Sequence, residues 1–87
     1  LTRTLAVELG PDIRVNAVAH AVVKTQFATA LYEGREDEVA QAYPVGRLGT
    51  PEDIGAAAAY LASADADRIT AQGLTADGGL ITAGGTA

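Results

Sequence analysis

His20 is the residue of this chain whose type and position offer the most obvious chemistry. It is the only histidine, and it follows directly on a predicted strand, at the end where open α/β sheets place their ligands. An imidazole there could act as a general base near neutral pH or bind a metal ion. The simpler alternative is an exposed loop histidine without a function.

A metal site needs more ligands than one histidine provides, because zinc sites in proteins use three or four. Carboxylates follow at Glu33, Asp37 and Glu38. Two copies of His20 near a twofold axis of a homo-oligomer, together with these carboxylates, would complete the set. We therefore predict a divalent metal site, with zinc as the expected ion, at His20 and these three acidic residues. The alternative is that the acidic residues form a solvated helix face.

Such an ion would lower the pKa of a bound water molecule and polarise an ester. The chemistry expected from the residues is therefore metal-dependent hydrolysis of an activated phosphoester or ester. His20 would be the catalytic residue, and the substrate would be a small molecule. A Ser–His–Asp arrangement is not expected, because Ser63 is the only serine and is predicted to lie across the fold from His20.

Apolar spacing predicts the first elements that must position these residues. Leu1, Leu5 and Leu9 recur every four residues, which predicts a helix that stops at the Gly-Pro pair of residues 10–11. The stretch 13–19 is largely small and apolar, which is typical of a strand buried on both faces of a parallel sheet.

The rest of the chain contains one well-marked helix and one further strand. Thr50 can cap a helix over 51–63, and a proline follows it at the first helical position. Short helices are expected at 25–32 and 36–42, and a second strand at 73–76. The predicted order is therefore helix, strand, short helices, long helix, strand.

Length and composition limit the architecture. The 87 residues suffice for one small domain without disulfides, and nineteen of them are Ala, which buries little area. A core this thin favours stabilisation by a homo-oligomer. The formal net charge of −5 argues against a nucleic-acid partner, and no apolar run reaches the roughly 20 residues of a membrane-spanning helix. No signal peptide is visible, so we expect a cytoplasmic protein without a membrane partner.

The order of four segments resembles the C-terminal third of a short-chain dehydrogenase/reductase. They are LTRTLAVEL at 1–9, IRVNAV at 13–18, GRLGTPEDI at 46–54 and DGG at 77–79. The resemblance implies an α/β fold, namely a truncated Rossmann-type βαβ unit made of the last two parallel strands and their flanking helices. Residues 1–87 would then be a single C-terminal fragment without the cofactor-binding half.

Several features of that family do not occur in this sequence. The glycine-rich cofactor loop, the catalytic Ser and the Tyr-x-x-x-Lys motif all precede the matching segment, and the only lysine, Lys24, has no Tyr four residues before it. We therefore do not expect NAD(P) as a cofactor, nor hydride transfer by this chain by itself. His20 and Ala21 also stand where family members usually carry Pro-Gly, whereas Thr25 matches a family residue that contacts the cofactor.

Other functions stay open on these residues. The chain could be the C-terminal segment of a full NAD(P)-dependent oxidoreductase, a non-catalytic assembly module or a weak nucleotide-binding protein. In the family, the last strand and the helix before it form a twofold interface. The resemblance therefore implies contacts between copies of this chain through residues 51–63 and 73–76.

Overall fold

Helices and strands alternate along the chain in the predicted order. The structure, a computed structural model, describes residues 1–85, so the last two positions of the expected 1–87 domain lie outside the described residues. The elements are α1 (Thr2–Leu9), β1 (Ala17–His20), the 3₁₀ turn η1 (Thr29–Leu31), α2 (Glu36–Ala40), α3 (Pro51–Ala62), the 3₁₀ turn η2 (Ala64–Ala66) and β2 (Gly73–Ala76). This order confirms the α/β class.

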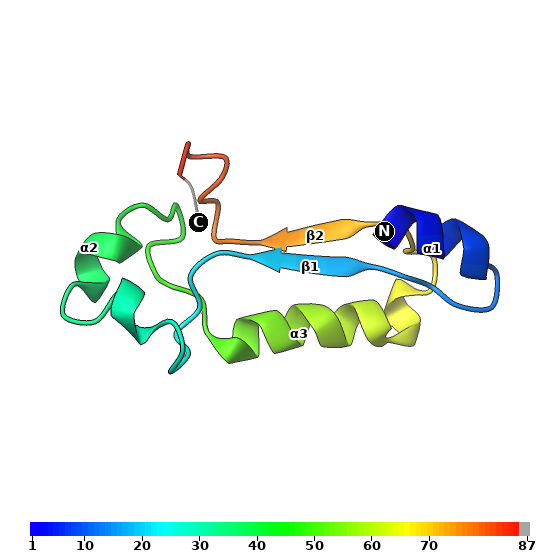
Figure 1. The fold of residues 1–87 in the computed structure, drawn as a ribbon, viewed down its shortest axis with the longest axis horizontal. Helices are drawn as coiled ribbons and strands as arrows, with labels where there is room; N and C mark the ends of the chain where they lie inside the picture. The colour runs from blue at the N-terminus through cyan, green and yellow to red at the C-terminus, as the bar shows by residue number, and fades with distance from the viewer. Residues whose placement is uncertain (86–87) are drawn as a thin grey trace.

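The two strands form a parallel sheet, and α3 lies in the connection between them. Ala17 lies opposite Gly73, and His20 lies opposite Ala76, so the strands run in register over their four residues. Figure 1 shows α3 running along the pair of strands, and the helix contacts both of them. The predicted βαβ unit is therefore confirmed, with β2 at its predicted bounds.

β1 begins later than predicted, because side chains rather than a strand ladder hold residues 14–16. The Asn16 amide donates to the Ile69 carbonyl over 2.9 Å, and its oxygen accepts from the Gln72 N–H over 3.1 Å. Opposite this segment, Ala71 has a φ of 64°, in the left-handed region, so the extended pairing begins only after it, with β2 at Gly73. The strand was also expected to be buried on both faces, and this is wrong for the described chain: Ala17, Ala19 and His20 are exposed, because one helix covers the sheet.

The start of α3 is fixed by the capping signal that the sequence contains. The Thr50 hydroxyl accepts a hydrogen bond from the Asp53 N–H over 3.2 Å, and the Asp53 carboxylate accepts from the Thr50 N–H over 2.8 Å. This reciprocal pair satisfies N–H groups that have no partner within the helix. Leu61 is the buried residue of α3, and half-buried Ile54 and Ala57 lie on the same helical stripe.

The segment between β1 and α3 is less helical than expected. The helix predicted at 25–32 is the single 3₁₀ turn η1, and the helix predicted at 36–42 is the five-residue α2. Thr25 and Thr29 explain the first difference, because their hydroxyls bond nearby backbone groups and favour turns over a continuous helix.

The described chain is elongated and has a small core. Its buried cluster consists of Tyr43, Leu48 and Leu80. The radius of gyration is 15.1 Å, whereas a compact chain of this length has one of about 12 Å. The accessible surface is 6157 Å², against about 4,800 Å² for a compact monomer of 8.8 kDa. The fold therefore leaves roughly 1,400 Å² more surface uncovered than a self-contained domain would.

α1 contributes to this uncovered surface. Its predicted end before Gly10 is confirmed. Ala6 is its buried residue, while Leu1 and Val7 are 94% and 82% exposed. Within residues 1–85, no helix has the length and apolar character needed to cross a membrane.

Candidate functional site

The carboxyl ends of β1 and β2 lie side by side, at His20 and Ala76. Just beyond this edge, Val23 and Gly49 form a single parallel bridge. The Lys24 N–H donates to the Gly49 carbonyl over 2.8 Å, and the Gly49 N–H donates to the Val22 carbonyl over 3.2 Å. The bridge ties the loop after β1 to the segment that leads into α3, so both walls of the site are held by backbone hydrogen bonds.

Tyr43 supports the same loop from the small core. Its ring is 5% exposed, and its hydroxyl accepts a hydrogen bond from the Val22 N–H over 3.1 Å. Tyr43 is therefore both a packing residue of the core and a support for the loop. Its role in positioning the loop was missed, since nothing in the spacing of the sequence relates residue 43 to residue 22.

A mainly apolar pocket of about 730 Å³ lies between the loop after β1 and the first half of α3. It is lined by His20, Ala21, Val22, Val23, Thr25, Phe27, Ala28, Ala30, Leu31, Pro51, Ile54, Gly55 and Ala58. Apart from His20, none of these residues has an ionisable side chain. The apolar run 21–23 directly after β1 is the sequence signal that could have indicated this wall.

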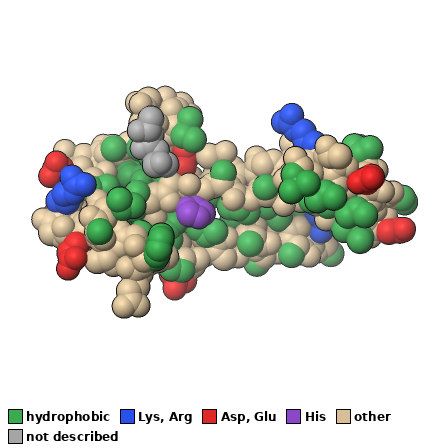
Figure 2. All heavy atoms as spheres, in the orientation of Figure 1, with side chains coloured by type: hydrophobic (Ala, Val, Ile, Leu, Met, Phe, Trp, Pro, Cys, Tyr) green, Lys and Arg blue, Asp and Glu red, His purple; other side chains and the backbone are tan. Residues whose placement is uncertain are grey.

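His20 lies on the rim of that pocket. The imidazole is exposed, and its Nδ1 is 2.8 Å from the Ala21 carbonyl oxygen. Figure 2 shows the ring at the surface beside apolar side chains. The structure thus places His20 at the carboxyl edge of the sheet, as predicted.

Thr25 lines the pocket and also caps the turn that follows it. Its hydroxyl oxygen accepts a hydrogen bond from the Ala28 N–H over 3.2 Å. A hydroxyl can still donate its own hydrogen while it accepts. The side chain therefore has a donor to offer a ligand at this edge.

The predicted metal ligands do not gather around His20. Glu33, Asp37 and Glu38 are exposed, the last two on α2. Nowhere in residues 1–85 do three His, Cys, Asp or Glu side chains come together in a way that could hold a metal ion. The prediction of a metal-binding chain is therefore not supported by the fold, because the segment after β1 turns the acidic side chains outward.

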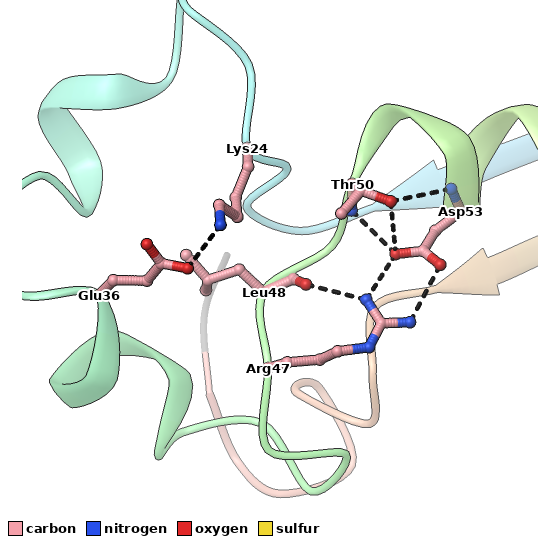
Figure 3. A network of polar contacts seen from close by, with 6 residues as sticks. All are labelled: Lys24, Glu36, Arg47, Leu48, Thr50 and Asp53. Atoms are coloured by element: carbon pink, nitrogen blue, oxygen red, sulfur yellow. Dashed lines mark hydrogen bonds and ion pairs between the residues drawn. The ribbon is translucent and has the colours of Figure 1, made fainter.

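An ion pair that the sequence did not reveal connects this acidic segment to the loop after β1. Lys24 Nζ lies 2.7 Å from a carboxylate oxygen of Glu36 (Figure 3). The hydrogen bond to the Glu36 carboxylate, followed by the attraction between the two charges, raises the pKa of Lys24. The pair joins the loop that follows β1 to the first turn of α2.

A second polar network lies where the segment before α3 enters that helix. Figure 3 shows Arg47 reaching the Asp53 carboxylate with both terminal nitrogens, at 2.7 and 3.0 Å. The Arg47 guanidinium, followed by the Thr50 N–H, holds the pKa of Asp53 well below its usual range. Arg47 thus ties the segment before α3 to the first turn of that helix.

A family sequence model identifies what this arrangement resembles. The model described as "Enoyl-(Acyl carrier protein) reductase" matches residues 1–81. The chain is also 44% identical over 82 residues to "Short-chain dehydrogenase/reductase SDRA" of Arabidopsis thaliana; the match covers 92% of this chain and 32% of that protein. The chain thus spans about a third of the length of this curated relative.

Solved structures agree with the sequence matches. A short-chain dehydrogenase/reductase of the glucose/ribitol dehydrogenase type from Brucella melitensis superposes with a TM-score of 0.86 at 35% identity; the match covers 91% of this chain and 32% of that one. The structure of ElxO with NADP bound superposes with a TM-score of 0.80 at 33% identity. This match covers 93% of this chain and 34% of ElxO.

These matches correct the predicted chemistry. The prediction of a metal-dependent hydrolase, with zinc as cofactor and His20 as its catalytic residue, is wrong, because the similar proteins are dehydrogenases and reductases. The expectation that NAD(P) plays no part is also wrong, since ElxO, a structural neighbour, holds NADP. Both errors came from treating the residues at the strand ends as a complete site.

Proposed function

Because this chain belongs to the short-chain dehydrogenase/reductase family, we propose that it is the C-terminal segment of an NAD(P)-dependent oxidoreductase and forms one wall of its ligand site. The observation that carries this proposal is the common edge of β1 and β2, where both strands end beside an uncharged pocket. Open α/β sheets bind their ligands at this edge.

The donor set at this edge suits one end of a dinucleotide. The pocket offers apolar side chains such as Val22 and Val23 for an uncharged ring, and the Thr25 hydroxyl as a donor. No glycine-rich loop for a pyrophosphate occurs in the sequence. When bound, the dinucleotide would supply the hydride-transfer chemistry. This chain's own residues would line the site, exclude water from it and orient what binds there.

We also propose that the uncovered surface includes a contact between two copies of this chain, through α3 and β2. Tyr60 and Leu74 are 46% and 39% exposed on these elements, and exposed apolar side chains at this density favour association. The cytoplasmic location and the lack of a nucleic-acid or membrane partner remain proposals that rest on composition and charge.

A graft tests the oxidoreductase proposal. Residues 1–85 would replace the matching third of the Arabidopsis relative, and oxidation of NAD(P)H would be followed with the carbonyl substrate of that parent. We expect the graft to turn over substrate, whereas the parent truncated before this segment should not. A second graft with His20→Pro and Ala21→Gly restores the residue pair usual in the family. If both grafts fold and neither is active, the proposal is wrong.

A further inference from the structure

His20 makes a hydrogen bond that determines which ring nitrogen carries its proton. A carbonyl oxygen can only accept, so the 2.8 Å contact between His20 Nδ1 and the Ala21 oxygen requires a hydrogen on Nδ1. In the neutral imidazole the other nitrogen, Nε2, is then a hydrogen-bond acceptor. Among residues 1–85 the structure gives Nε2 no hydrogen-bond partner.

The other polar side chains beside this edge are already engaged within the chain. The Lys24 ammonium pairs with Glu36, and the Asp77 carboxylate accepts from the N–H groups of Gly79 and Ile81, both over 3.0 Å. Ala76, the partner of His20 in the sheet, offers only a methyl group. His20 Nε2, by contrast, is a ring acceptor to which the structure gives no hydrogen-bond partner within residues 1–85.

The surroundings define the kind of ligand that this acceptor can select. His20 lies on the rim of the pocket of about 730 Å³, whose other lining residues are apolar apart from Thr25 and carry no charge. A charged ligand group would lose its hydration there without an opposite charge in return. A neutral N–H or O–H group loses less and gains a hydrogen bond to Nε2.

We propose that His20 is a specificity-determining residue, whose Nε2 accepts a hydrogen bond from a neutral N–H or O–H group of the ligand bound at the carboxyl edge of β1. The inference rests on the proposed oxidoreductase function. Two ligands of that reaction carry such a group: a nicotinamide ring, through its carboxamide, and an alcohol substrate, through its hydroxyl. In either case the Nδ1–H bond to Ala21 fixes the orientation of the ring and makes Nε2 the acceptor of its neutral form.

Two amide variants separate this role from a structural one. In His20→Gln the side-chain amide reaches the position of Nε2 and can present its oxygen there, whereas in His20→Asn the amide reaches only the position of Nδ1 and can keep the contact to Ala21. The measurement uses the graft defined above with three probes. These are NAD(P)H, the analogue in which an acetyl group replaces the carboxamide, and the alcohol substrate of the parent enzyme.

If the carboxamide is the donor, the graft that keeps His20 and its His20→Gln variant should bind NAD(P)H about 3- to 10-fold more tightly than its His20→Asn variant. This factor is the range for one neutral hydrogen bond. The acetyl analogue has no N–H donor, so it should bind with equal affinity to the graft that keeps His20 and to both variants. If the alcohol is the donor, all three should bind the dinucleotide equally. The KM for the alcohol should then rise about 3- to 10-fold in His20→Asn alone.

The outcomes distinguish this inference from the function on which it rests. Binding and KM values that are equal in the parent graft and both variants would overturn the role of His20 and leave the oxidoreductase proposal standing. Binding that depends on the variant but comes without turnover would overturn the oxidoreductase proposal and support the hydrogen bond. If no probe binds to the folded graft, both are overturned.

Discussion

Replacing Arg14 with Gln should loosen the junction between the start of the sheet and the end of α3. The Arg14 guanidinium donates from Nη1 to the carbonyls of Leu61 and Ile69, at 2.8 and 3.1 Å, and from Nη2 to that of Ser63, at 3.3 Å. Two of these carbonyls lie at the C-terminal end of α3, where a positive charge also interacts favourably with the helix dipole. Gln can replace at most part of this set, and it carries no charge.

The size of the effect follows from the two shorter bonds. A hydrogen bond to a charged group contributes about 1.5–3 kcal/mol, and Gln should recover part of one, so we expect a loss of about 2–4 kcal/mol in the free energy of unfolding. In a protein of 150–250 residues, such a loss lowers the melting temperature by roughly 4–16 °C. The melting temperature of the graft, measured at one scan rate, tests this.

Arg68→Gln is the matched control, because Arg68 is exposed and the charge change is the same. It should alter the melting temperature little. Arg14→Lys should give an intermediate loss, since an ammonium keeps the charge near the helix end but cannot copy the planar fork of the guanidinium. If Arg14→Gln and Arg68→Gln melt at the same temperature, the three carbonyl contacts do not stabilise the fold and the reasoning is wrong.

Three further predictions concern strain, charge and assembly. Ala71→Gly should raise the stability by about 0.5–1 kcal/mol, because Ala71 has a φ of 64°, and a lower melting temperature would contradict this. Because folding lowers the pKa of Asp53, its ionised form stabilises the fold above the ordinary carboxyl pKa, and this stabilisation is lost as the pH falls through the folded-state pKa. In Asp53→Asn the free energy of unfolding should therefore fall less steeply as the pH is lowered below about 4. An unchanged pH dependence would refute this. Ala59→Glu places a charge on the exposed side of α3, next to Tyr60. It should lower the association constant between copies at least tenfold, as measured by sedimentation. An unchanged association constant would show that α3 is not part of the proposed contact.

The sequence predicted those helix ends that depend on residues close by in the chain. The capping residues Thr50 and Asp53 fixed the start of α3, and the Gly-Pro pair fixed the end of α1. The start of β1 was not predictable in this way, because it depends on Arg14 and Asn16 bonding to residues about fifty positions away. Likewise, no local pattern relates Tyr43 to the loop that its hydroxyl supports.

The one burial prediction that failed also explains why the predicted chemistry was wrong. The small apolar side chains of β1 are typical of a strand covered on both faces, yet Ala17 and Ala19 are exposed in the described chain. The pattern therefore describes a packing that one copy of these residues does not provide, and another segment or another chain must supply the cover. A site at the edge of such a strand is incomplete for the same reason. Under the function proposed above, His20 would help to select a ligand that other parts of the enzyme largely hold, and it would not be the centre of a reaction of its own.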